Sequence, residues 1–120
     1  MVEDADCLFC RIRRGDVPAT FLYRDERVFA IRDIYPQAPV HILVLPVDHI
    51  RSLASIEPHH AGLLADLVLL SQRLAHEQGI AASGYRVIAN IGPDSGQAVD
   101  HLHLHVLGGR SLGPLISLPN

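Results

Sequence analysis

The stretch His101-Leu102-His103-Leu104-His105-Val106-Leu107 alternates three histidines with branched apolar residues. Successive side chains of a strand point to opposite faces, so this alternation predicts a strand with the three imidazoles on one face. Leu102, Leu104 and Val106 then face a core on the other side. Imidazole can act as a nucleophile, a general acid–base or a metal ligand near neutral pH, so the stretch indicates a reaction surface or a metal site. A polar strand face is the alternative.

A glycine-bearing loop, Gly92–Ala98, leads directly into this stretch. Glycine lets the backbone approach an anion closely, and free N–H groups in such a loop can hold phosphate oxygens. Gln97 adds an amide donor. Because an imidazole beside a phosphate site can attack phosphorus, the two features together indicate phosphoryl or nucleotidyl transfer through a covalent intermediate. A simple turn is the alternative.

Further apolar runs predict the rest of a sheet. Four more strands are expected from their alternating or β-branched patterns, at Phe21–Arg24, Arg27–Arg32, His41–Leu45 and Tyr85–Asn90. Short connections between five strands favour an antiparallel sheet in an α+β protein. The length of 120 residues suits a single domain, so we expect one domain over residues 1–120.

The period of the apolar pattern changes to helical spacing from about Ser55 to Gln78, with Leu63, Leu64, Leu67, Leu70, Leu74 and Ala75. Ser55 is a candidate cap, Pro58 fits a first turn and Gly79 fits the end of the helix. Val68 and Leu69 widen the apolar face, so we expect this helix to contact more than one layer. His59, His60 and His76 are expected to be solvent-facing.

Composition excludes several classes of function. A formal net charge of −3 argues against a broad nucleic-acid surface, which would be basic. The acidic start of the chain lacks the apolar core of a signal peptide, and no apolar run approaches a membrane span. We therefore expect a cytosolic protein that binds neither nucleic acid nor a membrane.

The only two cysteines form a C-x-x-C pair at Cys7 and Cys10. In a reducing compartment such a pair is more often a metal clip or a redox dithiol than a structural disulfide. No thioredoxin-like βαβ pattern surrounds it. Two buried, inert cysteines are the remaining alternative.

The segment from Asn90 to Arg110 resembles the signature of the histidine-triad family, in its nucleotide-binding, Hint-like branch. It carries Gly96-Gln97-Ala98-Val99-Asp100, the histidine stretch and then Gly108-Gly109-Arg110. Similar residues fall upstream, at Phe9, Ile12, Pro18-Ala19, Asp33-Ile34, Pro36–Pro39, His41 and Pro46–Ile50. The resemblance spans residues 7–110 and implies that family's α+β fold: a five-stranded antiparallel sheet, one long helix and a short N-terminal helix.

The resemblance implies hydrolysis or transfer at the α-phosphate of nucleoside 5′-monophosphate derivatives. Phosphoramidates are the usual substrates of this branch, and acyl-adenylates are a further class. His103 would be the nucleophile that carries a nucleotidyl intermediate. His105 would contact the phosphate and assist the leaving group, while the backbone carbonyl of His101 would orient the ring of His103.

The resemblance also assigns a binding site for a purine nucleotide or a nucleoside phosphoramidate. Asn90, Gly96, Gln97 and Ala98 would lie near the phosphate, and Asp33 would take the ribose hydroxyls. The base would pack against Phe9, Ile12, Ile31 and Ile34, with His41 near the catalytic histidines. Two features depart from the pattern: many relatives have serine at the place of Ala98, and the tail Ser111–Asn120 lacks a tryptophan that is common there.

Some bacterial members of the family carry zinc, and the resemblance implies the ligand set Cys7, Cys10, His49 and His101. Four protein ligands leave no open position, so the zinc would be structural. The family pattern also implies a homodimer. Two alternatives stay open: a nucleotide-binding or protein-interaction module with negligible turnover, and a dinucleoside polyphosphate hydrolase of the Fhit-like branch.

Overall fold

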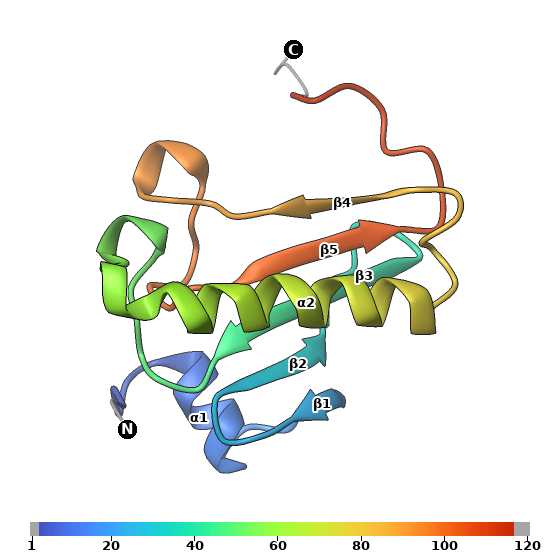
Figure 1. The fold of residues 1–120 in the computed structure, drawn as a ribbon. Coiled ribbons are helices and arrows are strands. Elements are labelled where there is room, and N and C mark those ends of the chain that lie inside the picture. The colour runs from blue at the N-terminus through green and yellow to red at the C-terminus, as the bar shows by residue number, and fades with distance from the viewer. Residues whose placement is uncertain (1–2, 117–120) are drawn as a thin grey trace.

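A computed structural model describes residues 3–116 and shows one antiparallel sheet with helices on both faces (Figure 1). The strand order is β1-β2-β3-β5-β4, so β1 and β4 form the edges. The expected α+β architecture with a five-stranded antiparallel sheet is confirmed. The strands are β1 (Phe21–Arg24), β2 (Val28–Arg32), β3 (Val40–Pro46), β4 (Tyr85–Ile88) and β5 (Leu104–Gly108).

The two helices cover opposite faces of the sheet because alternate residues of the central strands point to opposite sides. On β3, Ile42 and Val44 pack with the long helix α2 (Ala61–Glu77). Leu43 and Leu45 pack instead with the short N-terminal helix α1 (Leu8–Arg14). The strand at the centre of the sheet therefore separates a large core beneath α2 from a smaller one beneath α1.

The long helix begins later than the sequence predicted. Two short 3-10 turns, Leu53–Ser55 and Pro58–His60, precede α2, and Ser52 rather than Ser55 caps the first of them. The residue before Pro58 is extended, as proline requires, and this interrupts helical continuity. Gly79 has a φ of +75° directly after the helix, which confirms the expected end.

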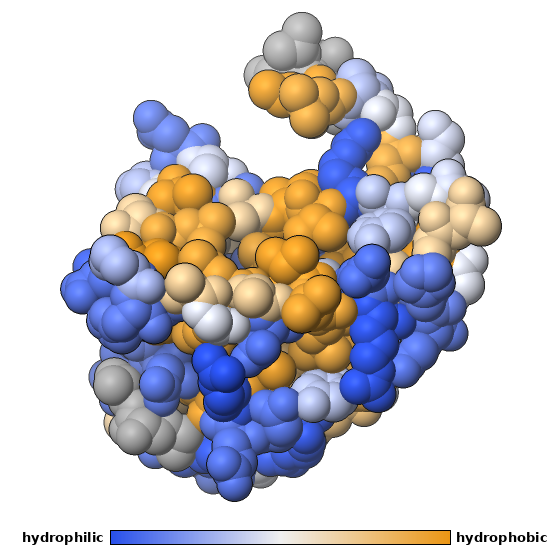
Figure 2. Space-filling view, viewed as in Figure 1, coloured by the Kyte–Doolittle hydropathy of each residue, from blue (hydrophilic) through white to orange (hydrophobic). Residues whose placement is uncertain are grey.

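The outward face of α2 was expected to contact a second layer, but within the described chain it is exposed. Val68 and Leu69 are 60% and 58% exposed. Apolar side chains gather over α2 and the neighbouring edge strand β4 (Figure 2). Within residues 3–116 no helix is long and apolar enough to cross a membrane. Positions 117–120 of the tail singled out above lie outside the described residues.

The last strand is shorter than the alternation predicted, and the three histidines do not share one strand. Only His105 lies within β5, while His101 and His103 precede it. The ladder with β3 stops at Leu104 because the next peptide turns away: the N–H of Leu102 donates to the carbonyl of Ile50 at 2.6 Å. Leu102, Leu104 and Val106 do reach the core beneath α2, as expected.

We predict that Gly109 is the glycine after β5 that tolerates substitution least. It has a φ of +96°, and a Cβ there would lie 2.9 Å from Cβ of Pro39. Gly109→Ala should lower the free energy of unfolding by about 2 kcal/mol or more, because left-handed backbone strain and a clash add together. Gly113→Ala is the control, since Gly113 also has a positive φ but open space around it. Equal losses for both variants in denaturant unfolding would show that the contact with Pro39 is unimportant.

Candidate functional site

His103 is held with one ring nitrogen free. Its Nδ1 lies 2.6 Å from the backbone carbonyl oxygen of His101. A carbonyl only accepts, so the Nδ1–H donates and the neutral ring keeps its lone pair on Nε2. The side chain is 8% exposed and rests edge-on against Phe9, with ring centroids 5.0 Å apart. His103 therefore presents an oriented, nucleophilic nitrogen.

A hydrogen-bond chain gives the neighbouring His105 the opposite tautomer. The backbone N–H of Gln37 can only donate, and it lies 3.0 Å from Nδ1 of His41, so that nitrogen accepts. The proton of neutral His41 is then on Nε2, which lies 2.9 Å from Nδ1 of His105. Because His105 accepts at Nδ1, its own N–H is at Nε2, on the far side of the ring.

Burial keeps this chain of imidazoles neutral near pH 7. Burial lowers the pKa of His105 to about 4, with the nearby rings of His103 and His41 adding to the effect and Asp33 opposing it. Burial also lowers the pKa of His41, against the opposing charge of Asp33. The ring centroids of His103 and His105 are 5.0 Å apart. An imidazole with a free lone pair thus stands beside one that offers a hydrogen bond.

Asp33, His41 and His105 bring one donor atom each within 4.8 Å of one another, which raises the question of a metal. A metal ligand needs a free lone pair, yet Nε2 of His41 carries a proton because Nδ1 accepts from Gln37. Asp33 Oδ2 lies 3.4 Å from that same nitrogen, and Asp33 Oδ1 accepts the N–H of Tyr35 at 2.8 Å. The geometry therefore favours a hydrogen-bonded relay over a metal centre.

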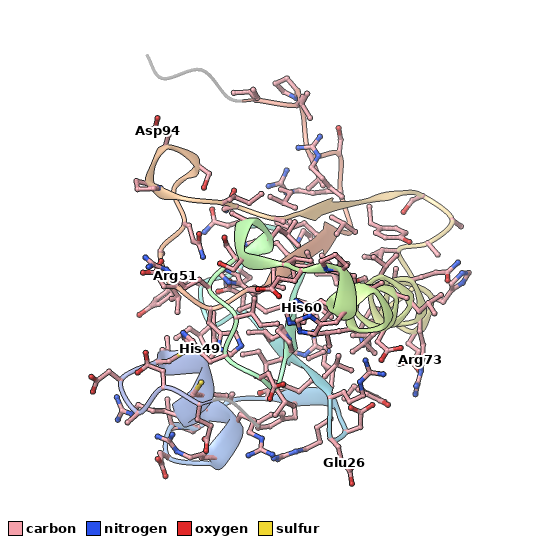
Figure 3. All side chains as sticks on the ribbon, turned by 60° about the vertical axis from the view of Figure 1, so that its left-hand side comes forward. Glu26, His49, Arg51, His60, Arg73 and Asp94 are labelled. Carbon is pink, nitrogen blue, oxygen red and sulfur yellow. The ribbon has the colours of Figure 1, made fainter. Side chains whose placement is uncertain are left out.

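The second cluster joins Cys7, Cys10, His49 and His101, as the resemblance implied, with donor atoms within 4.8 Å of one another. Cys7 caps the N-terminus of α1 and Cys10 lies in its first turn, while His49 follows β3. Nδ1 of His101 lies 3.3 Å from Sγ of Cys7 and 3.7 Å from Sγ of Cys10. Nδ1 of His49 lies 3.6 Å from Sγ of Cys10. Figure 3 shows His49 beside α1.

These residues fit a tetrahedral zinc ion. Zn–S and Zn–N bonds of ordinary length place neighbouring S and N ligands about 3.5 Å apart, close to the three separations above. Nε2 of His101 donates to the carbonyl of Pro46 at 2.9 Å, which leaves Nδ1 as the ligand nitrogen. Burial lowers the pKa of His101 to about 4, so the ring is neutral, as a ligand must be. Burial raises the pKa of the Cys7 thiol, and a cation would offset this.

The loop before the histidines holds itself together through Gln97. The side-chain amide of Gln97 donates to the carbonyls of Arg51 and Val99 at 2.8 and 3.0 Å, and its oxygen accepts the N–H of Gly92 at 2.9 Å. Both amide hydrogens are thus occupied, so this side chain organises the loop. Within residues 3–116 the backbone N–H groups of Ala98 and Val99 have no protein acceptor, which leaves them for an anion.

The other predicted binding residues are placed unevenly. Phe9, Ile12 and Ile31 share the core beneath α1 and are almost fully buried. Ile34 lies outside that core and is 74% exposed. Asn90 is half-buried shortly after β4. The structure therefore brings three of the four predicted base contacts together and leaves Ile34 apart.

The backbone groups that orient the histidines were not predicted from the sequence. The N–H of Gln37 and the carbonyl of Pro46 carry no side-chain signal. One signal was available in Gly109 and Arg110, which follow the histidine strand. Gly109 packs on Pro39, and the Arg110 guanidinium donates to the carbonyl of Gln37 at 2.8 Å, so this pair anchors the loop that supplies the Gln37 N–H.

Comparisons with known proteins agree with this geometry. The HIT domain model matches residues 14–112. The purine nucleoside phosphoramidase of Escherichia coli (strain K12) is 39% identical over 112 residues, which cover 93% of this chain and 94% of the relative. A 14 kDa zinc-binding protein of Zea mays is 41% identical, over 92% of this chain and 88% of the relative. The structure of a HIT family hydrolase from Clostridium thermocellum superposes with a TM-score of 0.92 at 44% identity, covering 96% of this chain and 100% of that one.

We predict near-stoichiometric zinc in the purified protein. Cys10→Ser should lose most of the zinc and lower the Tm, because a hydroxyl does not replace a thiolate ligand. Arg11→Ser changes the next, exposed residue of the same helix and should keep the metal. Elemental analysis and thermal unfolding measure both effects. Metal-free wild-type protein with a Cys7–Cys10 disulfide or free thiols would reject the site.

The depressed pKa of His105 predicts acid sensitivity. Between a folded pKa of about 4 and an unfolded pKa of about 6.5, the unfolded chain binds the proton more readily. The free energy of unfolding should therefore fall as the pH drops through this window, and the contribution of His105 should be constant above it. Urea unfolding at several pH values should show a smaller acid loss for His105→Asn than for wild type. Identical acid losses would contradict the assignment.

Proposed function

This chain belongs to the HIT family, and on that premise we propose that it hydrolyses nucleoside 5′-monophosphate derivatives at the α-phosphate. Nucleoside phosphoramidates are the proposed main substrates, with purine nucleosides favoured by the likeness to the Escherichia coli phosphoramidase. Acyl-adenylates share the same α-phosphate chemistry. The observation that carries the proposal is the pair of opposite tautomers at His103 and His105.

The two histidines would divide the chemistry of breaking a P–N bond. Nε2 of His103 attacks the α-phosphorus, and the amine departs with a proton. Binding of the phosphate anion would favour uptake of one proton from solvent by His105, and the Nε2–H of the resulting imidazolium would supply the proton that the amine takes. Water then attacks the nucleotidyl–His103 bond and gives a proton back to His105. The nucleoside monophosphate leaves, His105 releases the extra proton to solvent, and both imidazoles return to their starting states.

The phosphate would be held mainly by backbone groups. The free N–H groups of Ala98 and Val99 are suited to the oxygens on phosphorus, where negative charge develops during transfer. Alanine at position 98 supplies no hydroxyl, so the hydrogen bond that the family resemblance assigns to a serine at this place would be missing, at a cost of about 0.5–1.5 kcal/mol. Asp33 Oδ2 is the acceptor we assign to the ribose hydroxyls.

The metal in this proposal is a zinc ion held by Cys7, Cys10, His49 and His101. The zinc-binding relative from Zea mays supports this assignment. Four protein ligands give the ion a structural role, in which it would tie α1 to the segments after β3 and before β5. A reducing compartment such as the cytosol would keep both thiols available to it.

We also propose that a second copy of this chain covers the exposed apolar face of α2 and β4. Val68 and Leu69 lie on α2, and Tyr85 and Val87 are exposed on β4, which is an open edge of the sheet. Contiguous apolar surface of this kind is characteristic of an interface, and a two-fold pairing of identical faces would bury it.

The proposed function predicts that His103→Asn loses hydrolysis but keeps nucleotide binding. The asparagine amide can still donate to the His101 carbonyl, but it has no nitrogen in the place of Nε2. Hydrolysis of adenosine 5′-phosphoramidate should fall by about 10³-fold or more, while AMP affinity stays within a factor of three. Single-turnover kinetics and calorimetry measure the two quantities.

Substrate class is tested in the same assay with wild-type protein. Adenosine and guanosine phosphoramidates should have higher kcat/KM values than dinucleoside polyphosphates. A variant His103→Asn that retains a tenth of wild-type activity would overturn the covalent mechanism. Wild-type protein that binds AMP without hydrolysing any member of the panel would favour the alternative of a binding module.

A further inference from the structure

His101 takes part in the metal cluster of Cys7, Cys10, His49 and His101 and also orients the nucleophile His103, through two different parts of the residue. Its ring places Nδ1 beside the thiols of Cys7 and Cys10, at 3.3 and 3.7 Å. Its backbone carbonyl accepts the Nδ1–H of His103 at 2.6 Å. The residue is fully buried, so neither contact has water as a competitor.

The peptide unit between residues 101 and 102 is fixed at both ends. Its carbonyl accepts from His103, and its N–H, that of Leu102, donates to the carbonyl of Ile50 at 2.6 Å. Ile50 directly follows His49 in the chain. The peptide that follows one imidazole ligand, His101, is therefore hydrogen-bonded to the residue that follows the other, His49. The carbonyl of this same peptide accepts the hydrogen bond from the nucleophile.

Packing adds a second connection between the metal cluster and His103. Phe9 on α1 contacts the ring of His101 with centroids 5.8 Å apart and the ring of His103 at 5.0 Å. Phe9 lies between Cys7 and Cys10 in sequence. Movement of the first turn of α1 would therefore displace the thiols and the aromatic support of His103 together.

We propose that His101 is a positioning residue that couples the metal cluster to the nucleophile, so that metal retention and the orientation of His103 stabilise each other. The inference rests on the proposed zinc site. Coupling of two equilibria is reciprocal: if the metal strengthens the hydrogen bond to His103, that hydrogen bond strengthens metal retention by the same factor. A metal that only stabilised the fold would respond no more to loss of the donor at position 103 than to loss of another imidazole from the site.

The reciprocal effect can be measured on the metal-loaded protein without any activity assay. His103→Ala removes the donor to the His101 carbonyl, and His103→Asn keeps one. His105→Ala is the matched control, because it also removes an imidazole from the site, but one whose ring contacts His41 and His103 and not His101. The rate at which zinc passes to an excess of a chromogenic chelator is followed for all four proteins.

We expect zinc release to be about two- to tenfold faster from His103→Ala than from wild type, as the loss of one buried hydrogen bond implies. His103→Asn and His105→Ala should release zinc within twofold of wild type. Equal rates for both His103 variants would overturn the coupling. Wild-type protein that contains no zinc would instead reject the metal site, and an inactive wild type with normal coupling would reject only the catalytic proposal. Circular dichroism and a cooperative thermal transition for each loaded variant check that the comparison is between folded proteins.

Discussion

The hydrogen bond from Nδ1–H of His103 to the carbonyl of His101, 2.6 Å long, is the constraint on which the site depends. It sets the tautomer of His103 and so decides which nitrogen can react. The carbonyl is itself held, because the same peptide donates to Ile50 and the ring of His101 bonds the carbonyl of Pro46 at 2.9 Å. Two segments that are distant in sequence are thereby joined at the start of β5.

The tautomer of His105 is also determined indirectly, through backbone groups. The N–H of Gln37 determines the proton position on His41, and His41 determines it on His105. Arg110 and Gly109 hold the loop that carries Gln37, which gives a structural role to the Gly-Gly-Arg that ends the histidine strand. Backbone groups thus assign opposite proton positions to two chemically identical side chains, and this asymmetry is what lets one act as nucleophile and the other as donor.

Apolar periodicity and the histidine motif are local signals, and they predicted the sheet, the long helix and the row of three histidines. The ligand set Cys7, Cys10, His49 and His101 followed only from the resemblance to the family, because spacing cannot pair distant histidines with the two cysteines. The features that the sequence predicted wrongly, namely two element boundaries and one side-chain role, depend on tertiary contacts. The strand from His101 was too long because the alternation continues where the Leu102–Ile50 hydrogen bond replaces the ladder. The helix predicted from Ser55 begins only at Ala61, because Pro58 interrupts it and two short 3-10 turns take its place. The side-chain amide of Gln97 was expected to donate to phosphate, but in the structure it donates to the carbonyls of Arg51 and Val99. Orienting carbonyls and N–H groups leave no side-chain signal at all.

The division of roles at this site requires that His103 and His105 carry their protons on opposite nitrogens. Long-range ¹H–¹⁵N NMR of histidine-labelled protein at pH 7 reads the tautomer of each ring directly, with assignment by single His→Asn variants. We expect His103 to be protonated at Nδ1 with a lone pair at Nε2, and His105 to be protonated at Nε2. A His103 ring protonated at Nε2, or two rings in the same tautomer, would contradict it.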